Sequence, residues 1–146
     1  MTSGAIGGNS PPEIEDLFRF LTMAGFVKRS DRRGGMGGVL VILEGPAPGA
    51  EGPHTAWVEM LGDRGTWSVR LRMAGMSEFI HLMAWQAKLD GTPIREMNIA
   101  EQVEFVKARL QDVATAVRND PAIETALVQL GSQFMRQKYP WINKFR

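Results

Sequence analysis

The sequence lacks the residues that many catalytic and metal sites use. Its 146 residues include no cysteine, which excludes disulfides, thiolate metal sites and cysteine nucleophiles. It has two histidines, His54 and His81, and neither stands in a recognisable acid–serine setting. The G-x-S-x-G motif of many serine hydrolases is also missing. The sequence therefore predicts no catalytic residue that a local motif would reveal.

Long apolar runs and strong net charge are missing too. No stretch approaches the roughly 18 consecutive apolar residues of a membrane span. The start of the chain has no basic segment followed by an apolar run, so we expect no signal peptide. The formal net charge of +1 is too small to favour nucleic-acid binding by the whole surface, although no Asp or Glu follows Glu124. We expect a cytoplasmic protein without a membrane partner.

The clearest pattern that is present predicts a helix over residues 98–118. Asn98 caps its first turn, Glu101 completes a capping box, and Asn119, Asp120 and Pro121 end it. Apolar residues recur at 4-3-4-3-4 spacing and predict one buried seam, made of Ile99, Val103, Val106, Leu110, Val113 and Val117. The predicted solvent face holds Glu101, Gln102, Glu104, Lys107, Arg109, Gln111, Asp112 and Arg118.

Three more segments have helical patterns. Ser10 and Glu13 predict a second capping box for a helix that Gly25 ends, with Phe26 packing just beyond that end. Ser77 predicts the cap of a buried helix over residues 78–89. A last helix begins at Asp120 and Pro121 and carries an apolar face of Ile123, Leu127, Leu130 and Phe134.

Three segments are predicted to be antiparallel strands: Val39–Leu43, Thr55–Leu61 and Thr66–Met73. A four-residue loop, Gly62–Gly65, would join the last two and pair Leu61 with Thr66. In that register Met60 faces Trp67 on the core side. The other side of the hairpin then carries Trp57, Glu59, Arg70 and Arg72.

These elements predict an α+β domain over residues 10–146, in which an N-terminal helix and a three-stranded meander are followed by three helices packed on the sheet. Residues 1–9 are rich in Gly, Ser and Ala and are predicted to be a flexible arm. A helix followed by three strands and a helix resembles the opening of type III secretion chaperone-like and YbjN-like domains. The resemblance is one of layout over about the first 90 residues, and it ends where those families continue with two more strands.

Local candidates for chemistry have simpler structural interpretations. Glu78 and His81 form an E-x-x-H pair, but a di-iron bundle needs a second such pair and two further glutamates. Glu101 and Glu104 could act as paired carboxylates, yet their place on the solvent face favours a solvated helix surface. The basic run 28–33 continues into the glycine-rich stretch 34–38 and enters a strand, the reverse of a phosphate loop, so we interpret both segments together as a flexible basic connector. We expect neither metal nor cofactor.

Three functions stay open at this stage. The first is a non-catalytic protein-binding module, such as a toxin-immunity protein or a secretion-type chaperone, that binds through Trp57, Glu59, Arg70 and Arg72 unless the C-terminal helices cover that face. The second is nucleic-acid binding through Lys28, Arg29, Arg32, Arg33, Arg136, Lys138, Tyr139, Trp141 and Lys144. The third is a small-ligand protein or enzyme with a pocket between sheet and helices. The oligomeric state is undetermined, with a homodimer among the options.

Overall fold

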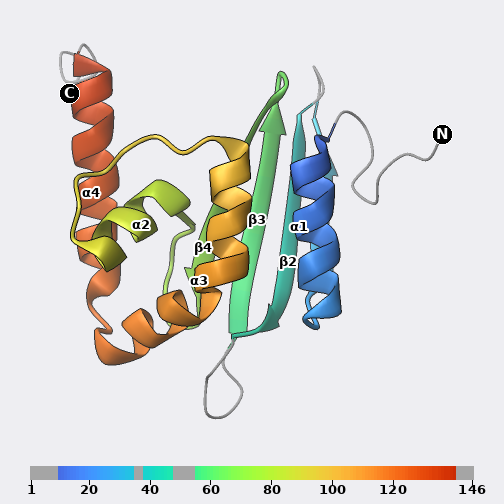
Figure 1. The fold of residues 1–146 in the computed structure, drawn as a ribbon, viewed down its shortest axis with the longest axis horizontal. Coiled ribbons are helices and arrows are strands. Elements are labelled where there is room, and N and C mark those ends of the chain that lie inside the picture. The colour runs from blue at the N-terminus through green and yellow to red at the C-terminus, as the bar shows by residue number, and fades with distance from the viewer. Residues whose placement is uncertain (1–9, 35–37, 48–54, 141–146) are drawn as a thin grey trace.

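The computed structural model describes residues 10–34, 38–47 and 55–140. Within these residues the fold is α+β, as predicted: one helix, an antiparallel sheet of five strands, then three helices (Figure 1). In chain order the elements are α1 Pro12–Met23, β1 Val27–Arg33, β2 Val39–Pro46, β3 Thr55–Asp63, β4 Thr66–Met73, β5 Ile80–His81, α2 Leu82–Asp90, α3 Ile99–Asn119 and α4 Ile123–Lys138. The predicted arm, residues 1–9, lies outside the described residues.

The sheet has a helix-covered inner face and an outer face. Its strands follow the order β1-β2-β3-β4-β5, and each pairs antiparallel with its neighbours. The inner face is buried and consists of Val39, Val41, Leu43, Ala56, Val58, Met60, Val69, Leu71 and Met73. These side chains share one apolar cluster with Leu17 of α1 and Val106 of α3, the helices that lie over the sheet in Figure 1. The core therefore forms between the inner face and these helices.

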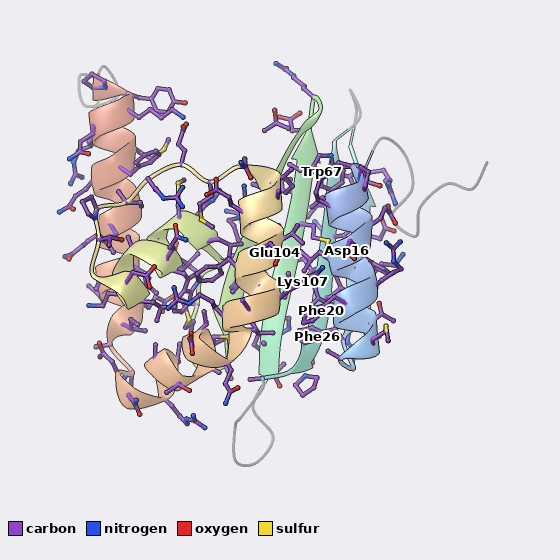
Figure 2. The ribbon with its side chains drawn as sticks, in the orientation of Figure 1. Asp16, Phe20, Phe26, Trp67, Glu104 and Lys107 are labelled. Carbon is purple, nitrogen blue, oxygen red and sulfur yellow. The ribbon has the colours of Figure 1, made fainter. Side chains whose placement is uncertain are left out.

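A charged contact also joins the two covering helices. Lys107 of α3 donates a hydrogen bond to the carboxylate of Asp16 on α1, and Figure 2 shows the two side chains facing one another across the gap between the helices. This bond lowers the pKa of Asp16, with the positive charges of Lys107 and Arg19 acting in the same direction. The predicted solvent face of α3 thus makes tertiary contacts, among them this bond and the ion pair of Arg109 with Asp90 of α2 at 2.6 Å.

The prediction of three strands misses β1, an edge strand. Residues 28–33, interpreted as a connector, pair with β2 across a bulge between Lys28 and Ser30. Charged residues on both sides of the strand hide any apolar alternation. Asp31 binds Lys28 at 2.9 Å and Arg33 at 2.9 Å, so these charges pair along the edge. A charged, bulged edge also resists pairing with other chains.

The prediction also misses β5, because the apolar run after Ser77 has a helical spacing. Ile80 and His81 instead pair with Leu71 and Arg70, and α2 begins only at Leu82. Ser77 caps no helix. Its backbone N–H and hydroxyl donate to the carboxylate of Glu124 at 2.9 and 3.1 Å, and this contact ties the start of β5 to α4.

The hairpin of β3 and β4 has a register two residues away from the predicted one. Asp63 pairs with Thr66 and Gly62 with Trp67, so the loop is the two-residue turn Arg64-Gly65. Both turn residues have positive φ, 54° and 81°, as a type I′ turn requires. Because a shift of two residues preserves the alternation, every side chain keeps its predicted face. Gly62 leaves space that the indole of Trp67 fills.

Two predicted helix ends are confirmed, and the cap predicted at Ser10 is wrong, as is the one at Ser77. The capping box of Asn98 and Glu101 is present at the start of α3. Gly25, with φ of 96°, ends α1, and the N–H of Phe26 bonds to the carbonyl of Leu21 at 2.9 Å, as in a Schellman motif. The capping box predicted at Ser10 is wrong. Its hydroxyl donates to Glu15, and Pro11 occupies the cap position without a side-chain bond.

The seam of α3 is confirmed at Val103, Val106, Leu110 and Val113, which are buried. The prediction that Gln102 lies on the solvent face of α3 is wrong, because this residue is only 7% exposed. Its Oε1 accepts the backbone N–H of Val69 at 2.8 Å, and its Nε2 donates to the carbonyl of Met97 at 3.0 Å. β5 pairs with only two residues of β4, so Gln102 satisfies a strand group that β5 does not reach.

Candidate functional site

The outer face of the sheet is the most extended candidate surface. Strand alternation places on it Val27, Ser30, Arg32, Leu40, Ile42, Glu44, Trp57, Glu59, Leu61, Ser68, Arg70, Arg72 and His81. Its apolar members do not belong to the core cluster that the helices form with the inner face. Leu40, Ile42 and Leu61 are half-buried, shielded by their neighbours on adjacent strands. At the β5 edge, Arg70 and His81 line a cavity together with residues of α2 and α4, whereas the apolar residues of this face on β1, β2 and β3 do not pack against the described helical core.

One row of the outer face is organised around Trp57. The guanidinium of Arg72 stacks on the indole, 3.9 Å from the ring centroid, and donates to the carbonyl of Met76 at 3.0 Å. The indole N–H donates to Glu44 at 3.2 Å, and Arg29 in the bulge of β1 lies 3.4 Å from the same carboxylate oxygen. These contacts hold a large amphipathic ring in one orientation.

The neighbouring row contains an ion pair at the centre of the face. Glu59 is 5% exposed and accepts hydrogen bonds from Arg70, which is opposite to it on β4. Arg70 in turn lies opposite His81 on β5. Burial lowers the pKa of His81, and the positive charge of Arg70 lowers it further, so the imidazole is neutral at pH 7.

An apolar strip completes the surface. Leu40, Leu61 and Ser68 are cross-strand neighbours, and Ile42 lies beside Glu59. Val27, at the outer edge, is 50% exposed. Half-exposed aliphatic groups beside a fixed tryptophan and arginines form the composition that is enriched at protein interfaces.

The structure brings the four predicted partner-binding residues together on this face. Trp57 and Arg72 are direct neighbours, as are Glu59 and Arg70. Glu59 holds Arg70 and is itself buried, so it offers little surface to a partner. The sequence interpretation missed Leu40, Ile42 and Leu61. The run of residues 39–43 is apolar on both faces, and this was the signal that could have located the first two.

The predicted nucleic-acid residues do not come together. Lys28, Arg29, Arg32 and Arg33 lie on β1, whereas Arg136, Lys138 and Tyr139 lie at the end of α4, which packs beside β5. Those strands are opposite edges of the sheet, about 19 Å apart at the usual strand spacing. Lys138 also pairs with Glu96. Trp141 and Lys144 lie outside the described residues.

The candidate catalytic pairs have structural roles or lie apart. His81 is in β5, so Glu78 and His81 do not share a helix as predicted. Glu101 caps α3 and binds Arg95 at 2.9 Å, and the hydrogen bonds from Arg95 and Asn98 lower its pKa. Among the described residues, no cluster of three or more His, Cys, Asp or Glu side chains could hold a metal ion. His54 lies outside these residues.

None of the helices in the described ranges is both long and apolar enough to cross a bilayer. The chain matches no protein-family model, no curated protein and no solved structure at a significant level. The geometry of the outer face is therefore the ground for a functional assignment.

Proposed function

We propose that this protein is a non-catalytic protein-binding module, with the role of a toxin-immunity protein or a secretion-type chaperone, that holds a partner protein on the outer face of its sheet. One observation carries the proposal. Trp57, held by Arg72 and Glu44, lies on the same face as half-exposed Leu40, Ile42 and Leu61, and no described helix covers them. Rigid aromatic anchors beside aliphatic groups are typical of binding hot spots.

The charges of this face define the partner's chemistry. Arg29 offsets Glu44, and Arg70 offsets Glu59, whereas Arg32 and Arg72 make no ion pair with any carboxylate in the described ranges. A partner with an acidic rim around an apolar centre would complement this arrangement. The pair of buried Glu59 and half-buried Arg70 fixes the centre of the face before binding, which reduces the ordering cost of association.

Site-specific photocrosslinking in the native cell tests the proposal. A benzophenone amino acid in place of Leu61 should crosslink one acidic protein, because Leu61 lies in the half-exposed strip of the outer face. The matched control carries the same group in place of Ala108, an exposed residue of α3 in the opposite layer. Equal crosslinking from both positions, or crosslinking to nucleic acid, would contradict the proposal.

A further inference from the structure

A second candidate site lies at the other edge of the sheet, in a cavity of about 420 Å³ between β5, α2 and α4. Its apolar walls are Phe79, Ile80, Met83, Ala84, Ile94, Leu127, Val128, Phe134 and Met135. Pockets of 300–1,000 Å³ with mostly apolar walls are the usual size for small ligands. The cavity therefore has the volume and the lining of a ligand site.

Gly131 helps to keep this cavity open. It follows Leu127 by one helical turn, on the side of α4 that packs toward α2 and β5. A Cβ placed on Gly131 would meet no atom within 4 Å, so any larger side chain would extend into empty space. A glycine in the middle of a helix costs about 1 kcal/mol relative to alanine, and packing does not require it here.

The apolar walls are also more exposed than the core requires. Val128 is 36% exposed and Met135 43% exposed. They are two of the four large apolar side chains that stand exposed in the described ranges, and both line the cavity. An apolar ligand body would cover them.

The polar groups of the lining favour a negatively charged head group. Arg136 lies in the last turn of α4 and makes no ion pair with any described residue. Arg70 also lines the cavity, positioned through Glu59, and Glu78 is the one carboxylate among the lining residues. His81 adds a neutral imidazole, which can donate or accept a hydrogen bond without adding charge.

We propose that this cavity binds a small amphipathic carboxylate, an apolar chain with one carboxylate that Arg136 binds and Arg70 assists. Guanidinium groups suit carboxylates because two parallel hydrogen bonds can form. The cavity shares Arg70 and His81 with the edge of the outer face, whereas Gly131, Val128 and Arg136 belong to α4. Substitutions in α4 therefore test the cavity separately from partner binding on the outer face.

Titration of the full chain with sodium decanoate, followed by amide shifts in NMR spectra, tests this proposal. We expect saturable shifts centred on the two segments that contain most of the lining residues, 79–84 and 127–136. Gly131→Leu should fill the cavity and abolish these shifts while keeping or raising the thermal midpoint. Thr125→Leu, at an exposed position on the same helix outside the lining, is the matched control and should bind as the wild type does.

The charge requirement has its own test. Arg136→Gln should weaken decanoate binding about threefold to tenfold, as for a partly exposed charged contact, and leave the affinity for 1-decanol unchanged. Shifts that do not saturate or that lie elsewhere, or unchanged binding by Gly131→Leu, would overturn the site. If Arg136→Gln changed the affinities for decanoate and 1-decanol equally, the proposal that the ligand is a carboxylate would be wrong.

Discussion

The contact between Gly62 and Trp67 allows a direct test of the hairpin register. An ideal Cβ on Gly62 would lie 2.6 Å from two atoms of the Trp67 indole, well inside the roughly 3.5–4.0 Å of a favourable carbon contact. Gly62→Ala must therefore displace the ring, at the cost of about 1–3 kcal/mol that overpacking usually carries. Alanine in place of glycine returns about 0.5–1 kcal/mol in a strand, so the net loss is smaller.

A double-mutant cycle of Gly62→Ala and Trp67→Ala separates the steric clash between the two residues from the effect of each substitution alone. Trp67→Ala alone should cost toward the lower end of about 3–5 kcal/mol, because the indole is only partly buried. In that background Gly62→Ala should be neutral or stabilising, which gives a coupling free energy of at least ~1 kcal/mol. Urea unfolding followed by circular dichroism measures all four proteins.

Gly131→Ala is the matched control for the glycine-to-alanine change. Gly131→Ala has no atom within 4 Å of its new Cβ, so its stabilising effect should add to the effect of Trp67→Ala. If Gly62→Ala and Trp67→Ala were additive within about 0.5 kcal/mol, the two residues would not be cross-strand neighbours. The register with Gly62 opposite Trp67 would then be wrong.

Three further predictions follow from the core, the histidine and the first residues of the chain. Leu110→Ala should lower the free energy of unfolding by about 2–5 kcal/mol, measured in urea, since Leu110 is buried in the seam of α3; a loss within ~0.5 kcal/mol would place the seam in solvent. Because the pKa of His81 is lowered from 6.5, the unfolded chain binds a proton more readily, and stability should fall as the pH drops below 6.5 toward the folded-state pKa. In His81→Gln, the free energy of unfolding should change less between pH 7 and pH 5. The carboxylates with lowered pKa values, Asp16, Asp31 and Glu101, affect stability only near or below pH 4.5. If the pH dependence of stability were the same in His81→Gln, it would come from another group. Deletion of residues 1–9 should leave the thermal midpoint nearly unchanged because their composition offers no apolar face, and a drop of several degrees would show a docked segment.

The sequence predicts elements whose signal is local. The α3 seam, its capping box and the Schellman end of α1 depend on residues within one or two turns, and all three are present. The faces of Trp57 and Arg70 depend only on strand parity, so they were correct although the register was not. Local patterns therefore placed each of these side chains on the face of the sheet where the structure has it.

The missed features depend on partners far along the chain. β1 is a strand because the edge of β2 offers hydrogen bonds, and its charged side chains conceal this. Gln102 has a polar side chain on a polar face of α3, so the sequence predicts that it is exposed. It is buried because its Oε1 accepts the backbone N–H of Val69, a residue 33 positions away in the chain. The cavity beside α4 requires β5, which a helical spacing had hidden. A single sequence contains no local record of these contacts.

The pair of Glu59 and Arg70 also changes which substitutions can test the interface. Arg70→Glu would place a second carboxylate beside the buried Glu59 and leave Glu59 without its partner, so it would disturb the fold as well as the surface. Trp57→Ala removes the half-buried ring from the outer face, where it does not contact the core cluster. It is therefore the better probe of binding.

The affinity of the crosslinked partner for Trp57→Ala tests the central claim most directly. Titration calorimetry should show that Trp57→Ala loses about 2 kcal/mol or more of binding free energy, roughly thirtyfold in affinity. Thermal unfolding of the variant should still be cooperative. The control Ala108→Glu, on the exposed side of α3, should bind as the wild type does. Unchanged affinity of Trp57→Ala, or an equal loss in Ala108→Glu, would show that the partner does not bind the outer face of the sheet.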